Sequence, residues 1–359
     1  MSAKIVQIER RISSLLEYYS EMPPILFKDS INAWSGKINP RQYTDVSYKT
    51  VWDASYKYEI LQIKREMIKL RNILFIVMAL CGMAVCDVVM AQGHYSVGVC
   101  DWMVLKRQKI GEFKLAKELG CDGLEMDMGG LGRRDSFDNK LRQPEMARLF
   151  RHTADSLGVK VGAVAMSGFY GQSFAQKASW RWLIEDCLNA MDVMDASVAF
   201  LPLGGCGNGW TDSLPLRKEI VSRLRIAGDM AYARGKVIGI DTPLDAKGNK
   251  RLLKEIGSKG IKIFYKFQTA IDLRLDIPKD LRRLGASNIC AIHASNTDGV
   301  WLRHDKAIDM PAVKASLDKM GWTGWLFVER SRDVNRVRDV KLNYGENVKY
   351  LKEVFKNKK

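Results

Sequence analysis

Short apolar segments alternate with amphipathic segments along the chain after residue 93. Short apolar runs are typical of strands buried in a parallel sheet, and apolar positions that recur every three or four residues are typical of helices. The pattern predicts strands at residues 95–100, 123–128, 159–166, 197–203, 236–241, 261–267, 288–293 and 325–329. It predicts helices at residues 111–119, 144–157, 180–194, 216–234, 249–258, 278–284, 311–320 and 345–355.

This order of elements is typical of repeated βαβ units. Eight expected strands within residues 93–359 match a (β/α)₈ barrel, which takes about 250 residues. A doubly wound open sheet is the alternative, but it more usually carries a GxGxxG motif after its first strand. Here the first strand runs into residues 100–102, Cys-Asp-Trp, and the glycine-rich segment 204–209 follows the fourth strand without a P-loop lysine. We therefore predict a TIM barrel over 93–359.

Residues 67–92 have the layout of a secretory signal peptide. Lys69 and Arg71 precede an apolar run at 73–85, and small residues follow it. The run is short for a membrane span, and Asp87 ends it. We expect an exported, periplasmic protein with no stable membrane span in its mature form.

A signal peptide belongs at the start of a chain, yet residues 1–66 precede this one. The favoured interpretation is that Met67 is the true start and that 1–66 is an upstream translation artefact. The alternative is a real cytosolic extension before an anchor. A lipid attached at Cys86 is also open, although residues 83–85 fit that pattern poorly. No function is assigned to 1–66.

The composition is that of a globular protein, with 47% hydrophobic and 27% charged residues. The net charge of +16 allows nucleic acid, a membrane surface or anionic small molecules as partners. Because the basic residues are scattered, a solvated surface is favoured over a phosphate or nucleic-acid site. Seven cysteines without a CxxC or zinc spacing predict free thiols rather than disulfides.

Four expected strands in a row deliver one polar group each to the same rim: Asp241, Lys266, His293 and Glu329. Carboxylates with an imidazole suit Mn²⁺, Mg²⁺ or Zn²⁺, and such an ion polarises a carbonyl. A carboxylate can then remove the proton alpha to that carbonyl, and reprotonation of the enediolate gives an isomer or epimer. Each residue alone also fits a rim salt bridge or a hydrogen-bonded core histidine. The four together favour a site.

The segments GIDTPLDA, IHASNTDGVW and GWLFVERSRD carry a family resemblance, supported by GVCDWM and AKELGCDGLEMDMG. Over about 95–355 the chain resembles the sugar phosphate isomerase/epimerase family, also called xylose-isomerase-like TIM barrels. The resemblance implies a sugar or sugar-phosphate isomerase or epimerase. It implies Asp241 and Glu329 as catalytic carboxylates, and Asp241, His293 and Glu329 as ligands of a divalent metal.

Two positions depart from the family pattern. Asp241 stands where the family has Glu, and Lys266 where it has a metal-binding Asp or Asn. An ammonium has no lone pair to give and repels a cation. Either the metal site is weakened or lost, or Lys266 acts as a fixed charge that stabilises an enediolate or forms a Schiff base. Two alternatives are a non-catalytic carbohydrate-binding barrel and a Lys266 that points outward after a register shift.

A relative in the same family cuts DNA at abasic sites with a trinuclear zinc centre, which needs many histidines. This chain has four, at positions 94, 152, 293 and 304. We therefore expect a small sugar as the partner and no nucleic acid. The sequence does not determine which sugar, whether it is phosphorylated, or the oligomeric state.

Overall fold

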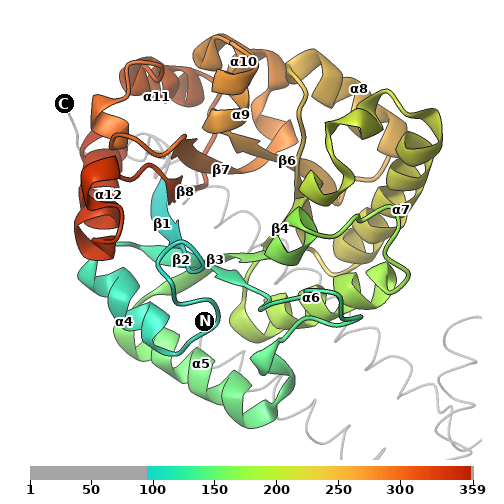
Figure 1. Ribbon diagram of the computed structural model, residues 1–359, viewed down its shortest axis with the longest axis horizontal. Helices are drawn as coiled ribbons and strands as arrows, with labels where there is room; N and C mark the ends of the chain where they lie inside the picture. The colour runs from blue at the N-terminus through green and yellow to red at the C-terminus, as the bar shows by residue number, and fades with distance from the viewer. Residues whose placement is uncertain (1–94, 357–359) are drawn as a thin grey trace, which may run out of the picture. The chain divides into compact units, whose positions relative to one another are not determined.

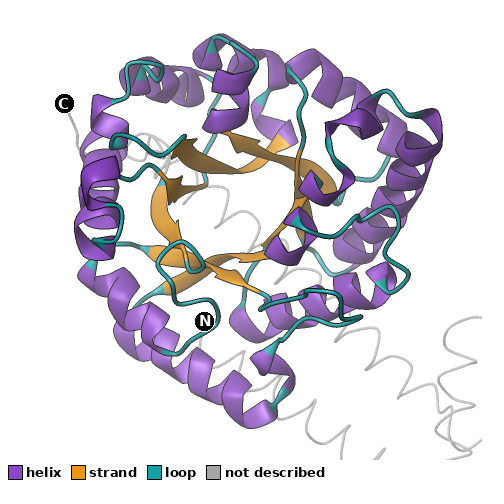
Figure 2. Cartoon of the chain, viewed as in Figure 1, coloured by secondary structure: helices purple, strands orange, loops and turns teal. Residues whose placement is uncertain are grey.

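The computed structural model describes residues 95–356, and these form a closed barrel of parallel strands in the order β1 to β8 (Figures 1 and 2). Each strand pairs in parallel with the next, and β8 closes the barrel on β1. The predicted (β/α)₈ barrel is confirmed. The predictions for residues 1–66 and for the signal-like segment 67–92 lie outside the described residues.

The strands lie within one or two residues of their predicted bounds, except at the end of the seventh. They are β1 (Ser96–Cys100), β2 (Gly123–Asp127), β3 (Lys160–Ala165), β4 (Val198–Pro202), β5 (Val237–Asp241), β6 (Ile261–Lys266), β7 (Ile289–Asn296) and β8 (Trp325–Arg330).

Helices form the outer ring of the barrel (Figure 1). They are α4 (Gly111–Glu118), α5 (Pro144–Leu157), α6 (Trp180–Met194), α7 (Leu214–Ala233), α8 (Ala246–Ile256), α9 (Phe267–Asp272), α10 (Ile277–Leu284), α11 (Met310–Lys319) and α12 (Val340–Lys356). Short 3₁₀ helices include η4 (Ser167–Tyr170) and η5 (Gly204–Cys206). No helix among the described residues is long and apolar enough to cross a membrane.

Four elements differ by three residues or more from the pattern-based prediction. α8 begins at Ala246, three residues before its predicted start, where the Asp245 side chain caps it by accepting from the Gly248 N–H. β7 continues three residues beyond His293 to Asn296, because buried polar side chains extend the strand where an apolar run stops. α9 was not predicted, since its six residues are too few to show a helical period. α12 begins at Val340 rather than at Gly345, and that glycine lies inside the helix instead of starting it.

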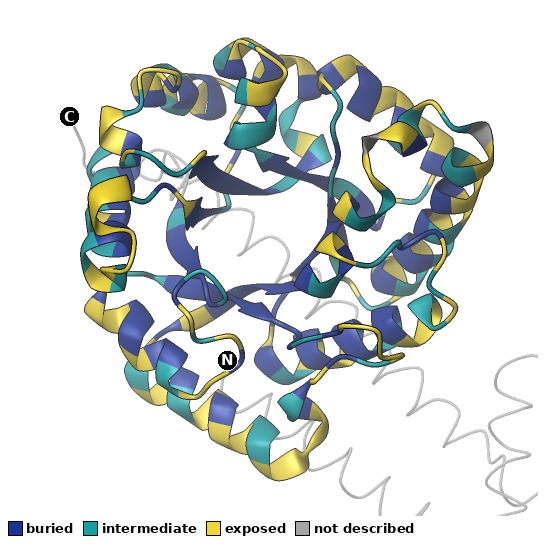
Figure 3. Cartoon of the chain, in the orientation of Figure 1, coloured by how far each residue is buried: buried dark blue, intermediate teal, exposed yellow. Residues whose placement is uncertain are grey.

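The barrel has a packed interior and a second core between its strands and helices (Figure 3). Alternate strand residues fill the interior, and they include Cys100, Phe200, Phe264 and Phe327. At the N-terminal end the Trp325 ring lies over Gly162, where a Cβ atom would stand 2.3 Å from its Cε2 atom. Trp325 therefore fills the interior between β3 and β8 at that end.

The five cysteines among the described residues are all free, as the sequence predicted. Cys100 and Cys187 are fully buried, and the other three are partly buried.

Candidate active site

The polar groups predicted at the strand ends do meet at one end of the barrel. Asp241 and Lys266 end β5 and β6, and Glu329 is the penultimate residue of β8. His293 lies inside β7 rather than at its end, and it pairs in register with Lys266. Parallel strands place all four on the C-terminal side, where TIM barrels carry their active sites.

Lys266 and Glu329 form an ion pair across the rim. The distance from Lys266 Nζ to Glu329 Oε2 is 2.7 Å, and the two side chains are 12% and 2% exposed. A pair this deeply buried is held in one geometry, unlike an exposed pair. Lys266 therefore points into the site, and the alternative of an outward-pointing lysine is wrong.

The electrostatics favour the charged form of both partners. Burial alone would raise the pKa of Glu329, but the nearby His293 and Lys266 charges outweigh it and lower that pKa. Burial alone would lower the pKa of Lys266, but the Glu329 and Asp241 carboxylates outweigh it and raise that pKa. At neutral pH the rim therefore carries a carboxylate and an ammonium in contact.

Asp241 is set apart from Glu329 by its pKa. Burial raises the pKa of Asp241, the Lys266 charge opposes this, and the Glu329 charge adds to it, so the pKa remains above its usual value. The Thr269 hydroxyl of α9 donates to Asp241 Oδ1 over 3.5 Å. Of the two carboxyl groups, Asp241 is thus the one that more readily holds a proton.

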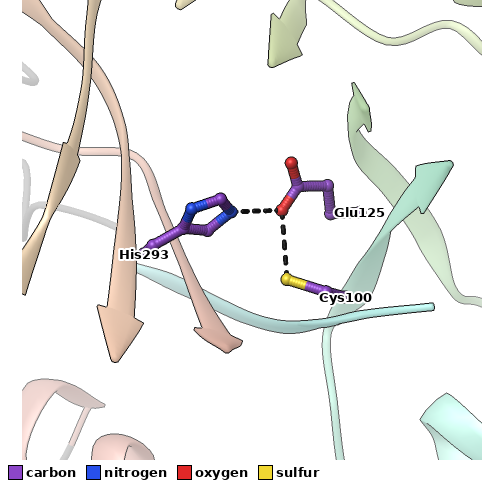
Figure 4. A group of neighbouring side chains, drawn as sticks. All are labelled: Cys100, Glu125 and His293. Carbon is purple, nitrogen blue, oxygen red and sulfur yellow. Dashed lines mark hydrogen bonds and ion pairs between the residues drawn. The ribbon is translucent and has the colours of Figure 1, made fainter. Parts of the chain in front are cut away.

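His293 is fully buried, and its ring contacts a second acid, Glu125 (Figure 4). Its Nε2 atom lies 2.7 Å from Glu125 Oε2, which also accepts from Cys100 Sγ at 3.3 Å. The His293 Nδ1 atom faces Glu329 Oε2 at 4.0 Å and has no hydrogen-bond partner among the described residues. Phe264 packs on the imidazole with ring centroids 4.3 Å apart.

Sequence reasoning missed Glu125 and Cys100. Both were placed in predicted strands, but neither was considered for the site. The available signal was a glutamate within an apolar strand, since a buried carboxylate in that position needs a partner. What the sequence could not give was the partner, because Glu125 and His293 are 168 positions apart.

Tyr170 of η4 also belongs to the site and was not predicted. Its hydroxyl donates to Glu329 Oε1 over 3.3 Å and accepts from Lys266 Nζ over 3.5 Å. The glycine-rich segment packs behind it, since a Cβ at Gly204 would lie 3.2 Å from the Tyr170 ring. This segment supports Tyr170 and does not form a phosphate-binding P-loop.

A further group of acids is buried beside the site: Asp101 follows β1, Asp127 ends β2, and Glu112 lies in the first turn of α4. Asp101, Glu112 and Asp127 are each 1% exposed or less. Burial, together with the Asp101 charge, raises the pKa of Asp127 to about 8, although Arg107 lies 3.4 Å away. Burial also raises the pKa of Asp101 to about 6.

The rim does not fit a divalent metal while Lys266 is charged. Its ammonium already lies against Glu329 and near Asp241, and it repels a second cation.

The deeper Cys100, Glu125 and His293 offer sulfur, oxygen and nitrogen atoms within 4.8 Å of one another, which are donor types that zinc accepts. However, tetrahedral zinc separates its oxygen and nitrogen ligands by about 3.3 Å, more than the 2.7 Å between Glu125 and His293. The assignment of Asp241, His293 and Glu329 as metal ligands stays a prediction.

Comparison with known proteins bears on the fold and the family. A family model described as xylose isomerase-like TIM barrel matches residues 113–354. A search of curated protein sequences gives no match.

Several solved structures share the fold. A D-psicose 3-epimerase with D-fructose is 13% identical, with a TM-score of 0.56 over 73% of this chain and 100% of that one. An L-ribulose 3-epimerase is 15% identical, with a TM-score of 0.57 over 73% of this chain and 95% of that one. A 3-keto-D-glucoside 4-epimerase from E. coli is 17% identical, with a TM-score of 0.56 over 72% and 100%. At such identities the likeness concerns the fold alone.

Proposed function

The chain belongs to the xylose isomerase-like TIM barrel family, and from that premise we propose that it is a sugar isomerase or epimerase that moves a proton alpha to a carbonyl. One observation carries the proposal: two carboxyl groups whose pKa values are shifted in opposite directions flank one buried ammonium. Groups whose environments push their pKa values apart are suited to serve as base and acid.

The chemistry follows from the charges at the rim. Glu329, with its lowered pKa, is the base that takes the proton from the carbon next to the carbonyl. The C–H electron pair forms the C=C bond of the enediolate, and the carbonyl π pair moves to its oxygen, which becomes negative beside the Lys266 ammonium. Asp241, with its raised pKa, returns a proton to carbon. Return to the same carbon from the opposite face restores the carbonyl and gives an epimer. Return to the former carbonyl carbon, with the neighbouring hydroxyl proton passing to the former carbonyl oxygen, gives an isomer.

The surrounding residues hold this arrangement. Glu125 fixes the His293 ring through Nε2, so that Nδ1 is presented to the site. Tyr170 contacts both Lys266 and Glu329 and covers them from the side of η4. In this mechanism Lys266 supplies the positive charge. It does so as an ammonium and not as an amine that forms a Schiff base, because its pKa is raised.

Deuterium exchange tests the proposal. We expect the purified protein, incubated with a panel of ketoses in D₂O, to exchange C–H protons of at least one sugar. Glu329→Gln should slow this exchange by roughly 10²–10⁴-fold, the usual contribution of a general base. Glu145→Gln, at an exposed position in the first turn of α5, is the matched control and should retain the full rate.

A chelator tests whether Lys266 or a divalent metal supplies the positive charge at the site. With EDTA present the exchange should continue, because Lys266 fills the role of the cation. Loss of exchange with EDTA and recovery with Mn²⁺ would refute that role and favour the metal-assisted mechanism that the family resemblance implies.

The second candidate is a carbohydrate-binding barrel without catalysis. The Lys266–Glu329 ion pair favours it, since each charge neutralises the other in the free protein. Calorimetry that finds a sugar bound without any exchange of its C–H protons would select this function over the first.

A further inference from the structure

A groove at the opposite end of the barrel is lined by one sign of charge. It has a volume of about 740 Å³ and lies where β5 and β6 begin and where α7 and α8 end. Five lysines line it: Lys236, Lys250, Lys254, Lys259 and Lys262. No Asp or Glu is among the described residues that line it. Because it lies at the N-terminal ends of the strands, it is separate from the site around Lys266.

Lys262 is the unusual member of this set. It shares the inward face of β6 with Phe264 and Lys266, because side chains alternate along a strand. It is partly buried, and its ammonium has no hydrogen bond or ion pair among the described residues. It lies close enough to Cys290 to act on that thiol, whose pKa burial raises to about 12 against the lysine charge. A partly buried cation without a counter-ion is a favourable partner for an anion.

Contacts with other residues account for two of the other lysines, and the helix dipole favours a third without giving it a counter-ion. Lys236 contacts Asp192 Oδ1 at 3.1 Å and the Ala196 carbonyl at 2.9 Å, and Lys250 donates to the Arg283 carbonyl at 2.8 Å. Lysines near a helix C-terminus are favoured by its dipole, and Lys254 is in the last turn of α8.

Two lysines of the groove remain besides Lys262. Lys254 has no ion pair or hydrogen bond among the described residues, and Lys259 contacts only the Tyr232 ring, at 5.8 Å from its centroid. Three ammonium groups therefore face one concave surface without an ion pair among the described residues.

We propose that this groove binds a small molecule carrying clustered oxyanions, either phosphate or sulfate groups. Its volume is that of a ligand pocket. A concave wall of one charge sign concentrates ions of the opposite sign, and ammonium groups suit phosphate as point charges. The exposed Tyr232 ring offers a flat apolar side to the ligand. The site does not depend on the proposed reaction at the other end of the barrel.

Calorimetric titration of the full-length protein at low salt tests the site, with pyrophosphate in one arm and a sulfated disaccharide in the other. We expect saturable binding of at least one probe at one site per chain, weakening as salt is added. The arm that binds more tightly identifies phosphate or sulfate as the source of the oxyanions.

Three variants and a control locate the binding. Lys262→Met, Lys254→Met and Lys259→Met should each weaken the better probe by about tenfold, the loss expected for one charge-assisted hydrogen bond. Lys117→Met is the matched control, since Lys117 is an exposed lysine in the last turn of α4. This variant should bind the probe as tightly as the parent does. Thermal melts check that each variant is folded. The proposal is overturned if neither probe binds, or if the three groove variants bind as tightly as Lys117→Met.

Discussion

At the scale of single residues, Lys266 decides what the rim can do. A carboxylate at the end of β6 would complete a set of metal-binding donors with Asp241, His293 and Glu329. The ammonium instead pairs with Glu329 at 2.7 Å and holds the negative charges without a metal. The same position therefore sets both the ligand preference and the stability of the site.

Two substitutions at Lys266 separate these effects. Lys266→Asp should bind Mn²⁺ or Mg²⁺ about tenfold more tightly than the parent, which is ~1.4 kcal/mol of binding free energy. Lys266→Ala leaves the buried Glu329 without its cation, and we expect the free energy of unfolding to fall by about 1–3 kcal/mol. Metal titration by calorimetry and urea unfolding measure the two changes.

The control for stability is Lys341→Ala. Lys341 is 71% exposed and pairs with Glu118 on the surface, so its loss should change the stability little. Equal effects of Lys266→Ala and Lys341→Ala, together with no gain of metal affinity in Lys266→Asp, would contradict the position that we give to Lys266.

Asp127 gives a pH-dependent prediction at the same scale. The folded protein holds the Asp127 proton up to about pH 8, whereas the unfolded chain loses it near pH 4. Between these values the unfolded state binds fewer protons, so the free energy of unfolding falls as the pH rises. Asp127→Asn removes this loss. It should be more stable than the parent at pH 8 by up to about 5 kcal/mol, with little difference at pH 4.

Urea unfolding across this pH range measures the difference. Asp135→Asn, at a side chain that is 83% exposed, is the control and should follow the parent at every pH. A constant offset between Asp127→Asn and the parent from pH 4 to 8 would show that Asp127 is not the group that titrates.

At the scale of elements, close packing between strands fixes the floor of the barrel. Gly162 in β3 lies under the Trp325 ring of β8, which stacks on Phe327 with ring planes 5° apart. The β3 backbone and the Trp325 ring can lie this close only because Gly162 has no side chain. The rim depends on the same register, because β8 carries Glu329.

Gly162→Ala should therefore destabilise the barrel. Its Cβ would stand 2.3 Å from Trp325, and overpacking of this kind costs about 1–3 kcal/mol. Gly171→Ala is the control, since no atom lies within 4 Å of its Cβ and its φ of −106° suits any residue. Urea unfolding of both variants compares them, and an undiminished stability of Gly162→Ala would mean that the Trp325 ring moves freely aside.

At the scale of the whole molecule, the barrel has two ends of different character. At the C-terminal end Lys266 lies in contact with Glu329, and at the N-terminal end one groove is lined by five lysines and no acid among its described residues. The basic residues behind the chain's net charge of +16 are thus partly grouped in the fold. The scattered-surface interpretation of the basic residues overlooked this grouping, because lysines from different helices and strands meet only in the fold.

Export of the whole protein is the remaining prediction, and it depends on Lys69, Arg71 and the apolar run at 73–85. Fractionation of the host, followed by N-terminal sequencing, should find the mature protein outside the cytoplasm with an end near Gln92 or Gly93. A cytosolic product that still contains residues 1–66 would refute the signal-peptide interpretation.

The sequence by itself determined the order of the strands and the groups that they carry to the rim. Alternation of apolar and amphipathic segments is a local property, and eight such units have few ways to bury their apolar faces. The carboxyl ends of parallel strands share one rim, so Asp241, Lys266 and Glu329 could be placed there without coordinates. His293 was also placed in the site, although the end of its strand was set too early, because buried polar residues in β7 resemble a loop.

Only the tertiary structure decided which groups touch and which protons they hold. Glu125 meets His293 across 168 positions, and Tyr170 meets Glu329 across 159. No local pattern marks such pairs, because loop and helix lengths set the distances between them. The pKa shifts of Asp241 and Asp127 arise first from burial, and burial belongs to the packed barrel rather than to either residue.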